Sequence, residues 1–193
     1  LFLIQLSVLT YKRMWQQNGE AIPLNPDKSL IDIFTDALPF DLTKAQERVL
    51  IEILDDIESD SPMSRLLQGD VGSGKTVIAL AALLVAAVNG YQGAFMVPTE
   101  ILAEQHFLSI FKLLSSTGKL EQQDNLLFLG FQGIPRTFSI ALLTGSQTKS
   151  VKEDIRQKLL EGKIDIVIGT HALIQKEIQI PWLALIVVDE QHR

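Results

Sequence analysis

The chain has 193 residues, of which 47% are hydrophobic and 21% charged, an ordinary globular composition with enough apolar material for one sizeable core. It contains no cysteine, which excludes disulfides, thiolate metal sites and iron–sulfur clusters and makes the cytoplasm the expected compartment. The formal net charge of −6 excludes a broad positive face, so any contact with nucleic acid must be local, through loops and backbone amides.

The N-terminal part of the chain has a helical pattern followed by a linker. Residues 1–18 are expected to be helical, residues 21–29 have the proline and asparagine content of a linker, and residues 30–37 predict a short helix. The apolar start carries its basic residues after the apolar run, unlike a secretory signal, and no apolar run is long enough to span a bilayer. We therefore expect residues 1–37 to be a helical extension that follows a preceding domain.

Residues 43–57 predict an amphipathic helix, in which Thr43 caps the start and Gln46 lies three residues later, as in a capping box. A regular alternation follows. Strands are expected at residues 65–68, 94–97, 139–143, 164–168 and 185–188, and helices at residues 75–89, 100–114 and 151–161. Several strands are unbroken apolar runs, as in a parallel sheet covered on both faces, which indicates the α/β class. Residues 115–136 are polar and glycine-containing and are interpreted as an insertion.

The strongest chemical signal is an eight-residue run between an expected strand and an expected helix. It reads Gly69-Asp70-Val71-Gly72-Ser73-Gly74-Lys75-Thr76 and fits the phosphate-loop pattern at every fixed position. Glycines let successive backbone N–H groups turn inward around an anion, and the helix N-terminus adds partial positive charge. Lys75 is expected to reach the β- and γ-phosphates, and the Thr76 hydroxyl to bind Mg²⁺. The alternative is a glycine-rich turn without a ligand.

An acidic pair, Asp189-Glu190, directly follows the apolar residues 185–188. Carboxylates at the end of a buried strand are costly unless a cation lies nearby, and beside a phosphate loop that cation is Mg²⁺. Asp189 is expected to hold the metal, and Glu190 to orient and deprotonate the attacking water. The alternative is an acidic strand end that faces solvent.

The run Asp189-Glu190-Gln191-His192 resembles the acidic motif of helicases and translocases of superfamily two. Further segments match this superfamily in order. Residues 40–46 resemble the adenine-recognising Q motif, residues 98–106 motif Ia, and residues 144–146 and 169–173 motifs Ib and Ic. In the Q motif the amide of Gln46 would pair with N6 and N7 of adenine, which favours ATP over GTP.

The same resemblance implies that loops after strands contact the DNA backbone through hydroxyls and N–H groups. The residues carried over to this role are Thr99, Glu100, Thr144, Gly145, Thr170 and His171. Without the resemblance, each of the threonines is more often a helix cap. His106, within an expected helix, is interpreted as a structural side chain.

Four blocks narrow the resemblance to one family. Residues 66–76, 98–106, 169–173 and 189–193 resemble the RecG family of ATP-dependent DNA helicases. Transcription-repair coupling translocases and primosomal helicases typically lack the Gln-His-Arg ending. The resemblance implies Mg·ATP hydrolysis that drives remodelling of stalled forks and Holliday junctions in recombination and repair. The alternatives are another translocase of the superfamily, a phosphate-loop kinase of small molecules, and a module that holds nucleotide without turnover.

The resemblance runs from about residue 38 to residue 193, except over residues 115–136, where this chain is longer than the family pattern. It implies that residues 38–193 form the first RecA-like lobe, with a mainly parallel sheet flanked by helices. Residues 1–37 loosely resemble the connection from the family's wedge domain. The wedge domain, the remaining motifs and a second RecA-like lobe, which supplies arginine fingers to the γ-phosphate, are expected outside this chain as partners within one protein.

Overall fold

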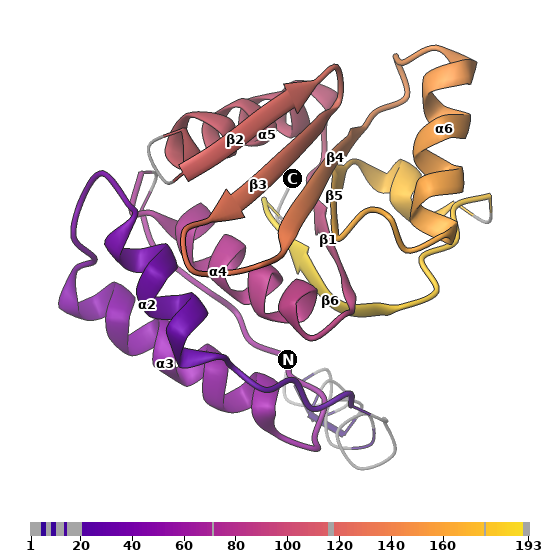
Figure 1. The fold of residues 1–193 in the computed structure, drawn as a ribbon. Helices are drawn as coiled ribbons and strands as arrows, with labels where there is room; N and C mark the ends of the chain where they lie inside the picture. Colours follow the sequence, from indigo (N-terminus) through magenta and orange to yellow (C-terminus); the bar gives the residue numbers. More distant parts are fainter. Residues whose placement is uncertain are drawn as a thin grey trace.

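The computed structural model describes residues 5–6, 9–10, 14, 21–70, 72–115, 118–175 and 177–190. The helix expected over residues 1–18 falls largely outside this part, and so do the site residue Val71 and residues 191–193. The described residues form layers of helices around one six-stranded sheet (Figure 1).

The sheet is mainly parallel, which confirms the expected α/β class. Its strands are β1 (Gln92–Met96), β2 (Gly118–Gln123), β3 (Leu126–Phe131), β4 (Thr137–Leu143), β5 (Ile166–Gly169) and β6 (Leu183–Val188). The spatial order is β2-β3-β4-β5-β1-β6, in which β4, β5, β1 and β6 run parallel. The hairpin of β2 and β3 extends the sheet beyond β4 with antiparallel pairing.

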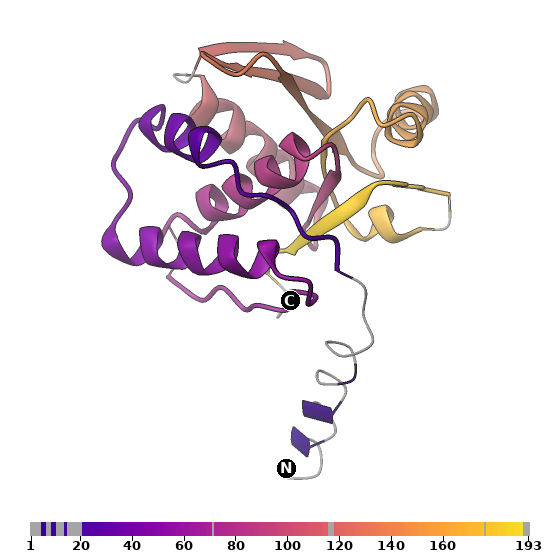
Figure 2. The same ribbon diagram turned by 60° about the horizontal axis from the view of Figure 1, so that its bottom comes forward.

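Helices cover both faces of the sheet. They are α2 (Lys28–Asp36), α3 (Lys44–Glu58), α4 (Lys75–Val88), α5 (Glu100–Leu114), α6 (Lys149–Leu160) and the short 3-10 helix η1 (His171–Ile174). Along β4, Ile140 packs into the core shared with α4 and α5, whereas the next residue, Ala141, packs into the core shared with α6. This alternation of side chains is what a strand buried on both faces requires. Figure 2 shows α2 and α3 outside α4, as a further layer.

The central helix α4 is apolar on all sides. Ten of its residues are buried, which is the pattern of a helix enclosed by the core rather than one at the surface. Its N-terminus begins at the phosphate loop, so burial of the helix fixes the position of that loop. None of the helices in the described part of the chain has the length and apolarity that crossing a membrane requires.

The predicted N-terminal extension and the predicted insertion pack against each other. Leu30 and Phe34 of α2 are fully buried, and the Phe34 ring meets the edge of Phe131 in β3 at a centroid distance of 6.2 Å. Leu127 and Leu129 of the same strand are also fully buried in the core that α2 joins. Residues on both sides of the expected boundary at residue 38 therefore share one core.

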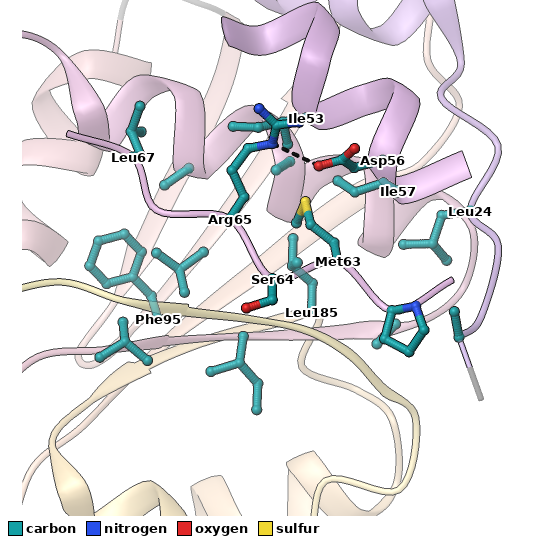
Figure 3. A pocket seen from close by; sticks show the side chains of 18 of the residues that line it. Leu24, Ile53, Asp56, Ile57, Met63, Ser64, Arg65, Leu67, Phe95 and Leu185 are labelled. Carbon is teal, nitrogen blue, oxygen red and sulfur yellow. Dashed lines mark hydrogen bonds and ion pairs between the residues drawn. The ribbon is translucent and has the colours of Figure 1, made fainter. Parts of the chain in front are cut away.

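The strand expected at residues 65–68 is not present, which corrects the sequence-based prediction. β6 is the outermost strand on its side of the sheet, and its outer edge pairs with no strand among the described residues. Residues 62–67 line a cavity together with β6. Arg65 is bound to α3 at 2.7 Å through Asp56, as Figure 3 shows, and at 2.7 Å through Glu52. A strand needs a hydrogen-bonded neighbour, so the apolar pattern alone does not produce one here.

Candidate nucleotide site and adjoining loops

The loops that follow four parallel strands lie side by side at one edge of the sheet. Because β4, β5, β1 and β6 are neighbours in that order and run in the same direction, their carboxyl ends meet there. The first polar residues after these four strands are Thr144, Thr170, Thr99 and Asp189. The topology therefore places the candidate DNA-contacting loops in one row that ends at the acidic pair.

The phosphate loop has a backbone that requires its glycines. Gly72 and Gly74 have φ angles of 81° and 80°, in the left-handed region that favours glycine. A Cβ at Gly74 would also lie 2.3 Å from the side-chain nitrogen of Gln46. Gly74 is the N-cap of α4 and provides no side-chain cap, so the first N–H groups of the helix are available for an anion.

The ammonium of Lys75 lies within the phosphate loop. Its Nζ donates to the carbonyl oxygens of Gly69 and Asp70, at 2.8 and 2.9 Å. The loop also closes on itself, since the Ser73 N–H donates to the Asp70 carbonyl at 3.1 Å. An ammonium has three donors, and these two bonds leave one for a phosphate oxygen. The loop, the helix start and the lysine therefore fit a polyphosphate.

Gln46 connects the start of α3 to the phosphate loop. Its side-chain oxygen accepts from the Thr43 N–H at 2.7 Å, and the Thr43 hydroxyl accepts from the Gln46 N–H at 3.3 Å, which completes the predicted capping box. Its Nε2 donates to the Ser73 carbonyl at 2.9 Å. The amide keeps one further N–H and one further lone pair, so it retains the groups that reading a base edge requires.

The acidic pair is held by hydrogen bonds from two directions. The Asp189 N–H donates to the Met96 carbonyl of β1 at 2.9 Å. Oδ1 of Asp189 accepts from the Glu190 N–H at 2.9 Å, and Oδ2 lies 3.0 Å from Nε2 of His106. Glu190 has a φ of 54°, a left-handed conformation that is uncommon for a residue with a side chain. The strand thus ends immediately before the acidic pair.

Lys75, Thr76 and Asp189 line one cavity of about 580 Å³. The cavity continues from these polar residues along the outer edge of β6, where Leu67, Phe95 and Leu185 are among the apolar side chains that line it, labelled in Figure 3. The structure thus brings the predicted phosphate-binding lysine, the predicted metal-binding hydroxyl and the predicted metal-binding carboxylate to the same space.

The protein groups at this cavity fit Mg²⁺. In the described part of the chain, no three or more His, Asp or Glu side chains are arranged to hold a metal ion by themselves. Mg²⁺ does not need such a cluster, because it keeps several waters and is typically bound by one or two carboxylates together with substrate phosphates. Thr76 and Asp189, which share the cavity with the phosphate-binding lysine, match that pattern.

Two of the candidate DNA-contacting loops are joined to each other. A carboxylate oxygen of Glu100, in the first turn of α5, accepts from the Ser146 N–H at 3.2 Å. The hydrogen bond from the Ser146 side chain is the main cause that lowers the pKa of Glu100. The backbone N–H groups of Ser146 and Gly145 and the positive charge of Lys152 lower this pKa further. Thr144 itself is only 1% exposed, and its hydroxyl lies 3.2 Å from the Ser146 hydroxyl. Of residues 144–146, Gly145 and Ser146 are therefore the two that are exposed to solvent.

The other two candidate loops begin helices. The Thr99 hydroxyl accepts from the Leu102 N–H and caps α5, and the Thr170 hydroxyl accepts from the Ala172 N–H and caps η1. Both threonines thus have the structural role that the sequence alone favoured. His171 follows Thr170 on the surface and is exposed. A helix start still offers N–H groups to a phosphate, so capping and DNA contact are compatible.

Reasoning from the sequence missed the contact of His106 with the acidic pair. His106 lies in the middle of α5 and was interpreted as a structural side chain, yet its Nε2 is 3.0 Å from Oδ2 of Asp189. The two residues are far apart in the sequence, and no local pattern connects them. Only the pairing of β1 with β6 brings the helix after β1 alongside the end of β6.

Comparison with known proteins identifies the family to which the chain belongs. Residues 43–193 match the family model of the DEAD/DEAH box helicases. The ATP-dependent DNA helicase RecG of Synechocystis sp. is 43% identical over 192 residues, which cover 100% of this chain and 21% of that relative. RecG of Aquifex aeolicus is 42% identical over 193 residues, which cover 100% of this chain and 22% of that relative.

A solved structure agrees with these sequence matches. The structure of RecG bound to a three-way DNA junction superposes with a TM-score of 0.78 at 43% identity, and the match covers 94% of this chain and 22% of that chain. The chain therefore spans about a fifth of the length of these relatives.

Proposed function

Because this chain belongs to the DEAD/DEAH box helicase family, we propose that it is the nucleotide-binding lobe of an ATP-dependent DNA helicase that acts on branched DNA. The observation that carries the proposal is that the nucleotide cavity and the candidate DNA-contacting loops meet at the same edge of the sheet. The cavity lined by Lys75, Thr76 and Asp189 lies at this edge, beside the row of loops that follow β1, β4 and β5. A motor of this kind needs hydrolysis and DNA contact on neighbouring elements.

The phosphate loop and the acidic pair have separate tasks in ATP hydrolysis. The N–H groups at the start of α4 and the ammonium of Lys75 bind and orient the phosphates. Thr76 and Asp189 hold Mg²⁺, which supplies positive charge against the phosphate oxygens when bound. Glu190 orients the attacking water and accepts its proton.

The loops at the same edge contact the DNA backbone. After β4, Gly145 and Ser146 are exposed, but their N–H groups face the Glu100 carboxylate, which a DNA phosphate would have to displace. The starts of α5 and η1 add hydroxyls and helix N-termini. The chain carries a net charge of −6, so these contacts position DNA locally rather than attract it over a broad face.

Two observations support branched DNA as the substrate class. The relatives that match the whole chain are named ATP-dependent DNA helicase RecG, and the matching solved structure contains RecG on a three-way junction. These RecG proteins are about five times the length of the matched region, so we assign branch recognition to regions outside residues 1–193.

The test is ATP hydrolysis by the full-length protein on DNA substrates of equal length. We expect forked and four-way DNA to stimulate phosphate release well above linear duplex, and Glu190→Gln to remove the stimulated rate while nucleotide binding remains. Glu104→Gln, an exposed residue on α5, is the matched control and should hydrolyse ATP normally. Equal rates of phosphate release with forked, four-way and linear DNA would contradict the proposal.

Substituting Gln46 should change the choice of base. Gln46→Ala removes the amide, and we expect a loss of about 1–3 kcal/mol in the preference for ATP over GTP, as for other amide–adenine pairs. Gln46→Glu preserves the acceptor that caps Thr43 but removes both N–H donors, so it separates base recognition from capping. Affinities for Mg·ATP and Mg·GTP are measured by calorimetry. An unchanged ratio in both variants would restrict Gln46 to its structural contacts.

A further inference from the structure

We propose that His106 is a positioning residue for Asp189, which fixes the carboxylate that holds Mg²⁺ through a hydrogen bond from α5. This inference rests on the proposed function, because Asp189 is assigned to the metal there. In the sequence, His106 is interpreted only as a structural side chain. The positioning role follows from the way α5, β1 and β6 meet around one carboxylate.

The contact is direct and largely shielded from water. Nε2 of His106 lies 3.0 Å from Oδ2 of Asp189, and the two side chains are 15% and 25% exposed. A hydrogen bond between a nitrogen donor and a carboxylate is of the stronger, charge-assisted kind. Partial burial strengthens it further, since less water competes for either partner.

The imidazole is itself held in place. Its ring packs on the Phe95 ring of β1, with a centroid distance of 4.9 Å and an interplanar angle of 45°. Phe95 is 2% exposed, so it is a fixed part of the core. A donor whose ring is fixed by packing can orient its acceptor, whereas a donor on a mobile surface side chain would follow it.

The hydrogen bond from His106 restricts the rotation of the Asp189 carboxylate, which the backbone of β6 does not fix. Oδ1 of Asp189 accepts from the Glu190 N–H, but one hydrogen bond alone leaves the carboxylate free to swing about its Cβ–Cγ bond, whose rotamer distribution is broad. His106 binds the second oxygen and fixes that angle. A carboxylate has about four acceptor positions, and these bonds use one on each oxygen, which leaves positions for the metal or its waters.

Loss of this hydrogen bond should weaken the binding of Mg²⁺ more than the metal-free binding of the nucleotide. Groups that hydrogen-bond to metal ligands typically contribute about 10–100-fold to metal affinity. The phosphate loop leads into the start of α4, and the bonds of Lys75 go to carbonyls of that loop, so the part of nucleotide binding that needs no metal should be unchanged.

The experiment measures ATP affinity of the 193-residue chain by calorimetry, once in excess Mg²⁺ and once in EDTA. We expect His106→Ala to reduce the gain in affinity from Mg²⁺ by about tenfold or more, with the affinity in EDTA within twofold of wild type. His106→Gln places an amide nitrogen near the position of Nε2 and should restore most of the gain. Gln105→Ala, the exposed neighbour on α5, is the control and should behave as wild type.

The outcomes separate this inference from the proposed function. A wild-type chain that gains nothing from Mg²⁺ would contradict the proposed metal role of Asp189 itself. A normal gain in His106→Ala would overturn the positioning role alone. An equal loss in His106→Ala and His106→Gln would also overturn it, because the ring's packing on Phe95 and not the hydrogen bond would then be responsible. Thermal unfolding of each variant confirms that the fold is retained.

Discussion

Replacing Lys75 by alanine is expected to abolish Mg·ATP binding while the chain stays folded. Lys75 is the one side-chain cation in the described part of the phosphate loop, and its ammonium already lies among the loop carbonyls. The ammonium keeps one donor for a phosphate and would release one loop carbonyl to reach the second phosphate. With two such bonds, each worth about 1.5–3 kcal/mol, the affinity should fall by about 100-fold or more by calorimetric titration.

The matched control is Lys149→Ala. Lys149 is also the first residue of a helix, α6, but that helix packs on the other face of the sheet. The two variants remove the same charge from equivalent positions at a helix start, so helix stability changes alike in both. Unchanged affinity in Lys75→Ala, or an equal loss in Lys149→Ala, would remove the phosphate-loop assignment.

The elements predicted well from the sequence are those whose signals are local. The capping box of Thr43 and Gln46 marks the start of α3, and the apolar run from Val77 onward predicts the buried helix α4. The glycines at 72 and 74 are needed by the backbone that the loop adopts. In each case a few consecutive residues contain the whole physical reason for the structure.

The features that the sequence did not predict depend on distant partners. Residues 65–68 have an apolar strand pattern, but no strand lies beside them to pair with. The segment of residues 115–136 is interpreted from the sequence as a largely polar insertion with an apolar patch at residues 126–131, and its inner side chains are buried because α2 and α5 pack against the hairpin. The bond from His106 to Asp189 exists only once β1 and β6 are neighbours.

Residues 1–193 alone are expected to bind Mg·ATP but to hydrolyse it very slowly. Hydrolysis needs positive charge on the transferring phosphoryl group, and an arginine supplied for this purpose is worth about 10³–10⁵ in rate in GTPases. Each arginine in the described part of the chain is paired with a carboxylate. These are Arg48, Arg65, Arg136 and Arg156. Arg65 lines the cavity, but its guanidinium is bound to Glu52 and Asp56 of α3.

DNA should not stimulate this slow turnover, because the loops and the nucleotide cavity belong to one sheet, and the second lobe that would close over the γ-phosphate is expected outside residues 1–193. An open site also leaves water around the reacting charges, which weakens the electrostatic effect of Lys75. Phosphate release is measured for residues 1–193 and for the full-length protein, with and without forked DNA. We expect a difference of about 10³-fold or more between the two. Rapid, DNA-stimulated hydrolysis by residues 1–193 alone would show that the lobe supplies its own catalytic arginine, and substituting the six arginines of the sequence in turn, Arg13 and Arg193 included, would then identify it.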